Sequence, residues 1–203
     1  MPSVSRRVRP VIAAALAAVF AVGLSACTAN DPAADEFGKG DTVYSSNDVR
    51  VSEIKPAERG EPIEFSGTTE DGAEFDSADS LGDVTVVNFW YSSCGPCRLE
   101  AKDLEKVWQK HQDDDVAFVG VNIYDAADTA KAFADKFGVT YPSVMDAESG
   151  KAKLAFAKVT PIQAPPVTLV LDRQGRVAAR IVGPIDGPSV LSTLIQDTLA
   201  EKA

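Results

Sequence analysis

The CxxC pair Cys94 and Cys97 constrains the fold of this chain most strongly. It lies where a strand-like hydrophobic pattern changes to a helical one. Residues 84–90 form a β-branched and aromatic run without clear alternation, which predicts a strand buried on both faces of a sheet. After Cys94 the pattern becomes helical, because Leu104 begins a series of apolar residues at spacings of three and four. Cys94 and Cys97 therefore lie at a strand-to-helix junction, where backbone N–H groups and the helix dipole stabilise a thiolate.

The CxxC motif allows three interpretations. A structural disulfide is plausible outside the cytoplasm, but it would close a loop of only about four residues and remove little entropy from the unfolded chain. A zinc site usually needs four ligands, whereas the chain offers Cys94, Cys97 and the single histidine His111, with no second CxxC. The third interpretation is a redox pair, which the strand–helix context favours. The structural and metal interpretations remain as alternatives.

The rest of the chain alternates strands with helices. Such alternation implies an α/β sheet covered on both faces, and an antiparallel pair near the C-terminus makes the sheet mixed. The Asp71-Gly72 pair predicts a tight turn between the first two extended segments. In chain order, the predicted elements are extended segments at 63–66 and 73–76, a strand at 84–90, a helix after Cys94, a strand at 116–124, helices at 126–137 and 151–158, strands at 167–172 and 176–182, and a helix at 188–200.

The segment around the cysteines, "VVNFWYSSCGPCRLE" at 86–100, resembles the active-site segment of the thioredoxin superfamily. It is most similar to the extracytoplasmic TlpA/ResA-type thiol–disulfide oxidoreductases. Three later stretches match in order: "FVGVNI" at 118–123, "FGVTYPSVMD" at 137–146 and "APPVTLVLDRQGRV" at 164–177. The resemblance covers roughly residues 60–200. It implies an α/β, thioredoxin-like fold with a central mixed β-sheet flanked by helices and an N-terminal β-hairpin.

The resemblance assigns roles to the two cysteines and to a proline. Cys94 would be the attacking thiolate, exposed at the helix tip, and Cys97, one turn inside the helix, would resolve the mixed disulfide. The cis-proline that the family places opposite the active site corresponds to Pro166. The alternative is that Pro165 and Pro166 form a rigid loop without a cis peptide bond. Ser93 stands where the family often has Trp, and this smaller residue would leave Cys94 more exposed.

Glu100 is a further candidate for the site. It lies three residues after Cys97 and hence on the same helix face. TlpA/ResA-type proteins often carry a glutamate there, and a nearby carboxylate could move protons to or from the resolving thiol. Cytosolic thioredoxins carry a buried aspartate at the strand position of Asn88, whereas an amide cannot exchange protons. The alternative is that Glu100 is an exposed helix acid, one of 30 acidic residues in the chain.

The N-terminus has the pattern of a secretory signal. Three arginines lead into an apolar run at 11–23, and "LSAC" follows at 24–27. The run is short for a bilayer-spanning helix, which needs about 20 residues. Because "LSAC" resembles a bacterial lipobox, we expect Cys27 to be lipidated and to become the mature N-terminus. An ordinary signal peptide with an incidental cysteine is the alternative.

Composition divides the chain into three parts and excludes one class of partner. We expect a lipoprotein signal peptide at 1–26, a flexible tether at 27–58 because its composition is polar, and a thioredoxin-like domain at 59–203. Loss of the signal removes three arginines and leaves 17 basic against 30 acidic residues, a net charge of −13. Such a surface would repel nucleic acid and anionic lipid headgroups. Membrane attachment would then depend on the lipid, and we expect a monomer.

The predicted function is that of a lipid-anchored disulfide reductase on the extracytoplasmic face of the cell membrane. By resemblance, its substrate would be the oxidised CxxCH haem-attachment motif of apocytochrome c. The chain has no Gly-rich nucleotide-binding loop, so we expect no cofactor and a membrane electron donor of the CcdA type. Two alternatives remain: a disulfide oxidase or isomerase for secreted proteins, and a metal- or haem-handling lipoprotein. The Gly-Pro dipeptide between the cysteines favours the reducing direction.

Overall fold

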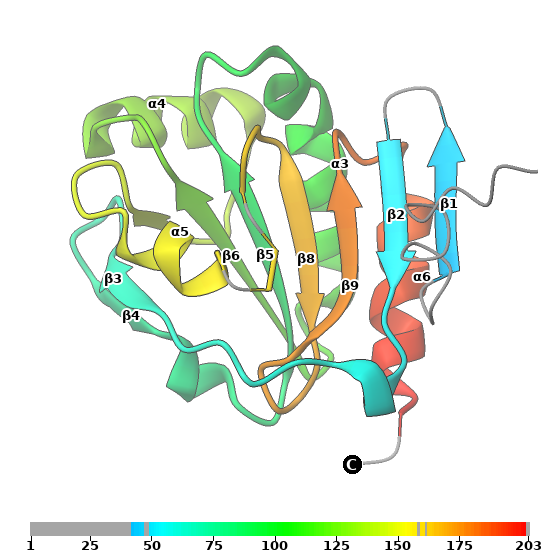
Figure 1. Cartoon of the computed structure of the whole chain (residues 1–203). Helices are drawn as coiled ribbons and strands as arrows, with labels where there is room; N and C mark the ends of the chain where they lie inside the picture. Colours follow the sequence, from blue (N-terminus) through cyan, green and yellow to red (C-terminus); the bar gives the residue numbers. More distant parts are fainter. Residues whose placement is uncertain (1–41, 47–48, 158, 161, 202–203) are drawn as a thin grey trace, which may run out of the picture. The chain divides into compact units, whose positions relative to one another are not determined.

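The computed structural model describes residues 42–46, 49–157, 159–160 and 162–201 (Figure 1). The sheet and the two neighbouring cysteines belong to one compact unit, Gly40–Ala203. The predicted signal peptide at 1–26 and the predicted lipidation site at Cys27 lie outside the described residues. Among the helices that are described, none is both long and apolar enough to cross a membrane.

The core of the unit is a mixed sheet of seven strands in the order β1-β2-β9-β8-β5-β6-β7. The central strand β5 pairs in parallel with β6 and antiparallel with β8, and all seven of its residues are buried. The mixed α/β sheet predicted from the sequence is therefore confirmed. The strands are β1 (Thr42–Ser46), β2 (Val49–Glu53), β5 (Val84–Trp90), β6 (Val116–Asn122), β7 (Ser143–Met145), β8 (Val167–Leu171) and β9 (Val177–Val182).

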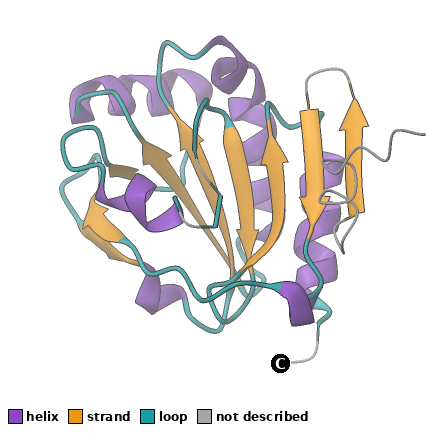
Figure 2. Cartoon of the chain, viewed as in Figure 1, coloured by secondary structure: helices purple, strands orange, loops and turns teal. Residues whose placement is uncertain are grey.

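Helices cover both faces of this sheet (Figures 1 and 2). The view of Figure 1 shows α5 and the β3–β4 hairpin in front of the sheet and α3 and α6 behind it. Each face has its own apolar core, one including Leu104 of α3 and Leu191 of α6, the other including Phe156 of α5 and Phe65. The helices and the hairpin strands are α3 (Gly95–His111), α4 (Ala127–Phe137), α5 (Lys151–Phe156), α6 (Pro188–Leu199), β3 (Ser66–Thr68) and β4 (Glu74–Asp76).

Most predicted elements are present with bounds that differ by a few residues. The predicted strand at 84–90 is β5, and the predicted helix at 126–137 is α4, which Gly138 ends in a left-handed conformation. The predicted N-terminal hairpin is β3–β4, shifted by up to three residues and built on the Asp71-Gly72 turn. The short strand β7, which has only three residues, was not predicted.

The prediction of a flexible tether over 27–58 is wrong for its described part. Strand β2 joins the main sheet, where Val51 lies opposite Ile181 of β9, and β1 adds one more strand beyond it. A short 3-10 helix, Pro56–Glu58, follows. The domain therefore begins well before residue 59. The polar composition of this segment is misleading because its backbone is satisfied by pairing with a strand more than 120 residues away.

Candidate active site

The end of β5 and the start of α3 place the two cysteines. Residues 91–93 turn the chain after β5, and Cys94 is the N-cap residue of α3, followed by Gly95 and then Pro96 in the first turn. Proline is favoured there because the first helical N–H groups have no intrahelical acceptor. The backbone N–H of Cys97 lies 3.1 Å from Cys94 Sγ. In the reduced protein this N–H and the helix dipole would stabilise a thiolate on Cys94.

Cys94 and Cys97 form a disulfide with an S–S distance of 2.05 Å and a Cα–Cα distance of 5.3 Å. The structure thus brings together the two residues that the sequence singles out as a redox pair. Among the described residues, no group of three or more His, Cys, Asp or Glu side chains is placed to hold a metal ion. The roles of Cys94 as nucleophile and Cys97 as resolving thiol remain predictions.

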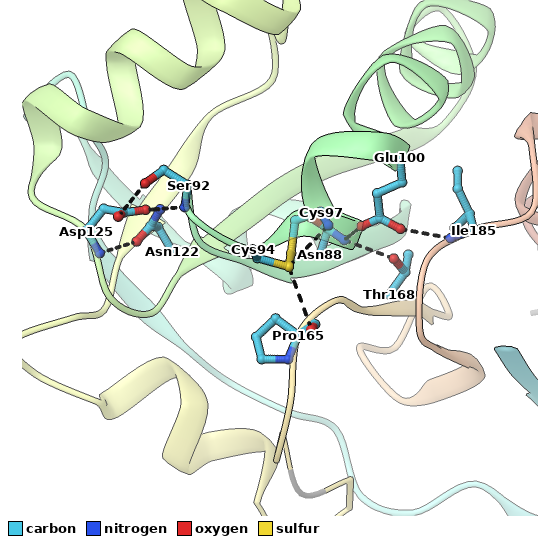
Figure 3. Close-up of a disulfide and its surroundings, with 10 residues drawn as sticks. All are labelled: Asn88, Ser92, Cys94, Cys97, Glu100, Asn122, Asp125, Pro165, Thr168 and Ile185. Atoms are coloured by element: carbon cyan, nitrogen blue, oxygen red, sulfur yellow. Dashed lines mark hydrogen bonds between the residues drawn. A yellow bond between two sulfur atoms is a disulfide. The ribbon is translucent and has the colours of Figure 1, made fainter. Parts of the chain in front are cut away.

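The expectation that Cys94 is exposed is wrong for this oxidised state. Its exposed fraction is only 3%, although its neighbours Ser93, Gly95 and Pro96 are exposed. The Cys94 sulfur lies 3.7 Å from the carbonyl oxygen of Pro165, in a loop 71 residues further along the chain (Figure 3). This loop therefore contributes to the burial of Cys94.

The loop that covers Cys94 contains the predicted cis-proline. The Pro165–Pro166 peptide bond is cis. This confirms the geometry expected at Pro166 and contradicts the alternative of a loop without a cis peptide bond. Pro166 is buried and leads directly into β8, which pairs with β5. A role for Pro166 in docking a peptide remains a prediction.

Glu100 is buried in the first half of α3, with an exposed fraction of 2%. The alternative of an exposed helix acid is therefore wrong. Its Oε1 accepts a hydrogen bond from Asn88 Nδ2 at 3.0 Å, and its Oε2 accepts one from the backbone N–H of Ile185 at 2.8 Å (Figure 3). The same Asn88 amide group also donates to Thr168 Oγ1 at 3.0 Å. The carboxylate is thus held by groups from β5 and from the loop after β9.

Burial changes the acidity of Glu100. Desolvation raises the pKa of this carboxyl to about 7, and the hydrogen bonds from Ile185 and Asn88 offset the rise only in part. A carboxyl with such a pKa can both take up and release a proton near neutral pH, which is what general acid–base chemistry requires. Glu100 lies one helical turn after Cys97, so the arrangement fits the predicted proton exchange with the resolving thiol.

The structure adds a second carboxylate that sequence reasoning missed. Asp125, in the loop between β6 and α4, accepts hydrogen bonds from both the backbone N–H and the hydroxyl of Ser92 (Figure 3). Ser92 lies in the turn that delivers Cys94. Thr168 and Ile185 were also missed. A signal for Asp125 was present, because it is a polar residue that directly follows the strand predicted at 116–124.

Comparisons with known proteins agree with this geometry. HelX of Rhodobacter capsulatus, a thiol:disulfide interchange protein, is 34% identical over 151 residues, which cover 73% of this chain and 76% of HelX. ResA of Geobacillus thermodenitrificans, a thiol-disulfide oxidoreductase, is 29% identical over 113 residues, which cover 56% of this chain and 62% of ResA. A crystal structure of a thioredoxin-family thiol:disulfide interchange protein from Chlorobium tepidum has a TM-score of 0.65 and 28% identity, and covers 72% of this chain and all of that one.

These similarities confirm the resemblance to thiol–disulfide oxidoreductases of the thioredoxin superfamily, and they confirm the thioredoxin-like fold. The Redoxin family matches residues 52–195, a span that includes both cysteines, Glu100 and Pro166. Since the match extends over more than half of the sequence, the chain belongs to the Redoxin family.

Proposed function

We propose that this protein is a lipid-anchored reductase of disulfides outside the cytoplasm, with apocytochrome c as its substrate. The coarser activity rests on the family: the chain is a thiol–disulfide oxidoreductase. The observation that carries the chemistry is the Cys94–Cys97 disulfide at the N-terminus of α3, with the buried carboxyl of Glu100 one turn further along.

The proposed reaction begins with the reduced protein. The Cys94 thiolate attacks one sulfur of a substrate disulfide, the substrate S–S bond breaks, and the released substrate sulfur takes up a proton. Cys97 then loses its proton and attacks Cys94 Sγ, which breaks the mixed disulfide and releases the second substrate thiol. The substrate disulfide gains two electrons and two protons, and the Cys94–Cys97 disulfide forms again. Glu100 would accept the proton of Cys97 in the second step and return it to solvent or to the leaving thiol.

The protein must be reduced again after each turnover. A secreted domain has no supply of glutathione or NADPH, so we propose that a membrane thiol–disulfide transporter of the CcdA type reduces Cys94–Cys97. The pattern at residues 6–27 supports a signal peptide followed by lipidation at Cys27, which would hold the domain near such a donor. A diacyl or triacyl cysteine supplies the two or more chains that stable anchoring needs.

The reduction potential tests the proposed direction. A reductase needs a low potential, as thioredoxin has at about −270 mV, whereas a strong oxidant such as DsbA lies at about −120 mV. We expect equilibration of the full chain with dithiothreitol to give a value near the first of these. The reduced protein should also reduce a peptide with an oxidised CxxCH motif faster than a peptide with the same residues scrambled. A potential near that of DsbA would instead favour an oxidase.

A further inference from the structure

Three hydrogen-bond donors converge on the carboxylate of Asp125. The backbone N–H of Ser92 donates to Oδ2 at 2.6 Å, and the Ser92 hydroxyl donates to Oδ1 at 2.7 Å. The side-chain amide of Asn122 donates to Oδ2 at 2.8 Å. Figure 3 shows this cluster beside the disulfide, on the side away from Glu100. The carboxylate therefore bridges the turn after β5 and the loop after β6.

Asn122 anchors this bridge to the sheet. It is the last residue of β6, lies opposite Trp90 of β5, and is completely buried. Its Oδ1 accepts hydrogen bonds from the backbone N–H groups of Tyr124 and Asp125 at 3.2 and 2.8 Å. The amide group of Asn122 is thus oriented with its oxygen toward the loop and its nitrogen toward the carboxylate. The position of Asp125 is fixed by a residue that cannot move without disturbing the sheet.

The carboxylate of Asp125 accepts from every group of this cluster. The Ser92 N–H and the Asn122 amide share Oδ2, and the Ser92 hydroxyl donates to Oδ1. An asparagine could keep these contacts, because a serine hydroxyl can also accept a hydrogen bond, so only an alanine at this position removes both acceptor oxygens. Hydrogen bonds to an ionised acceptor are also shorter and stronger than those between neutral groups.

We propose that Asp125 is a positioning residue for Cys94: it fixes the turn at 91–93 and so sets the direction in which the nucleophile meets a substrate disulfide. Ser92 is two residues before Cys94, and the Cys94 N–H donates to the carbonyl oxygen of Tyr91 at 3.2 Å, so the turn is short and continuous with α3. The rings of Tyr91 and Tyr124 pack edge to face over the same two loops, with centroids 5.0 Å apart. This role rests on the proposed disulfide exchange through Cys94.

Three variants of the full chain test the role. Asp125→Ala removes both acceptor oxygens of the cluster, and Ser92→Ala keeps the carboxylate but removes one donor. Asp128→Ala is the matched control, because Asp128 is exposed in the first turn of α4 and the substitution removes the same group. The reduced proteins are mixed with insulin, a protein with accessible disulfides, and the second-order rate constant is measured at about pH 9.5, above the ordinary thiol pKa of about 8.5.

Measurement at high pH separates the position of the thiolate from its pKa. A thiol with the ordinary pKa of about 8.5 is about nine-tenths ionised at that pH, so a modest change in pKa alters the rate by less than about twofold. A misplaced thiolate still reacts slowly. We expect the rate constant to fall by about tenfold or more in Asp125→Ala, since small misplacements of a reacting group are costly. It should fall less in Ser92→Ala and stay within about twofold in Asp128→Ala. If Asp125→Ala does not fold, Ser92→Ala still gives the comparison.

Amide hydrogen exchange supplies a readout that does not depend on activity. The Ser92 N–H should be protected in the wild type and should exchange at least about tenfold faster in Asp125→Ala, because its acceptor is lost. Wild-type rates at pH 9.5 in Asp125→Ala would overturn the proposal, as would an equal loss in Asp128→Ala or a slow rate with Ser92 still protected. If wild-type protein itself fails to reduce insulin, the proposed function is contradicted, and the rate of Cys94 alkylation in the same variants decides the role of Asp125.

Discussion

The side chains of Asn88 and Glu100 meet inside the domain, where Asn88 Nδ2 donates to Glu100 Oε1 at 3.0 Å and both residues are at most 3% exposed. An amide at position 88 can hold the carboxylate but cannot itself titrate. Of these two residues, Glu100 is therefore the one that can carry a proton. Burial raises the pKa of Glu100, and this affects both its capacity to exchange protons and the pH dependence of the free energy of unfolding. Each effect can be measured.

Replacement of Glu100 by glutamine should slow turnover without blocking the first attack. Glu100→Gln is nearly isosteric but cannot exchange protons, so we expect the rate of protein disulfide reduction near neutral pH to fall by about tenfold or more. The pH–rate profile should also lose the inflection near the Glu100 pKa of about 7. Cys94 should still react with iodoacetamide at close to the wild-type rate. An unchanged pH–rate profile would show that Glu100 has no proton role.

Glu100 should also make the stability of the protein depend on pH. Its pKa is about 7 in the folded protein against an ordinary 4.5, so between these values the unfolded chain has released a proton that the folded chain retains. Rising pH therefore favours unfolding, by about 1.4 kcal/mol per pH unit and roughly 3 kcal/mol in all. Urea unfolding from pH 4 to 8 should show this loss in the wild type relative to Glu100→Gln. Glu148→Gln, at an exposed position, should follow the wild type.

Arg59 should be essential for stability. Its guanidinium is 3% exposed and contacts Asp172 at 2.9 Å and Glu201 at 2.6 Å, while its Nε donates to the carbonyl oxygen of Ile54. Arg59→Met keeps an apolar stem like that of arginine but leaves the buried Asp172 without one of its two cations, so we expect a loss of about 3 kcal/mol or more in the free energy of unfolding measured in urea.

An exposed ion pair provides the comparison. Lys106 and Asp103 are 2.7 Å apart, but the lysine side chain is largely exposed. Lys106→Met should therefore change the free energy of unfolding by less than about 0.5 kcal/mol. Equal effects of Lys106→Met and Arg59→Met would mean that the Arg59 cluster contributes no more than a surface pair.

The proposed anchor depends on one residue. Cys27→Ala removes the sulfur that would carry the lipid, so the protein should leave the membrane fraction or keep its signal segment, while disulfide exchange by the domain stays unchanged. Fractionation of cells followed by mass spectrometry of the N-terminus distinguishes these states. A processed Cys27→Ala protein that still fractionates with membranes would contradict lipidation as the means of attachment.

The parts of the fold that depend on local patterns could be predicted from the sequence. The run at 84–90 is buried on both faces, as a continuous β-branched stretch predicts, and α3 begins directly after Cys94. The position of Pro166 could be assigned only because flanking residues resemble a known family. The roles that this resemblance implies for Cys94, Cys97 and Pro166 remain predictions until exchange is measured.

Features that depend on distant partners were missed. Strand β2 owes its place to β9, where Ser52 lies opposite Arg180, and nothing in residues 49–53 alone identifies that partner. The burial of Glu100 depends on the loop that carries Ile185, which covers one face of α3 after a separation of 85 residues. Burial of Cys94 likewise requires the loop at Pro165. Helical spacing can place a residue on a face, but it cannot say what covers that face.

The trapping of a mixed disulfide tests the central claim most directly. Reduced Cys97→Ser protein is incubated with a protein disulfide, and the product is digested and examined by mass spectrometry. Because Cys94 lies at the helix N-terminus and Cys97 would no longer resolve the intermediate, we expect a stable disulfide between Cys94 and the substrate, and none in Cys94→Ser. A mixed disulfide formed through Cys97 in the Cys94→Ser protein, with none trapped on Cys94, would contradict the account.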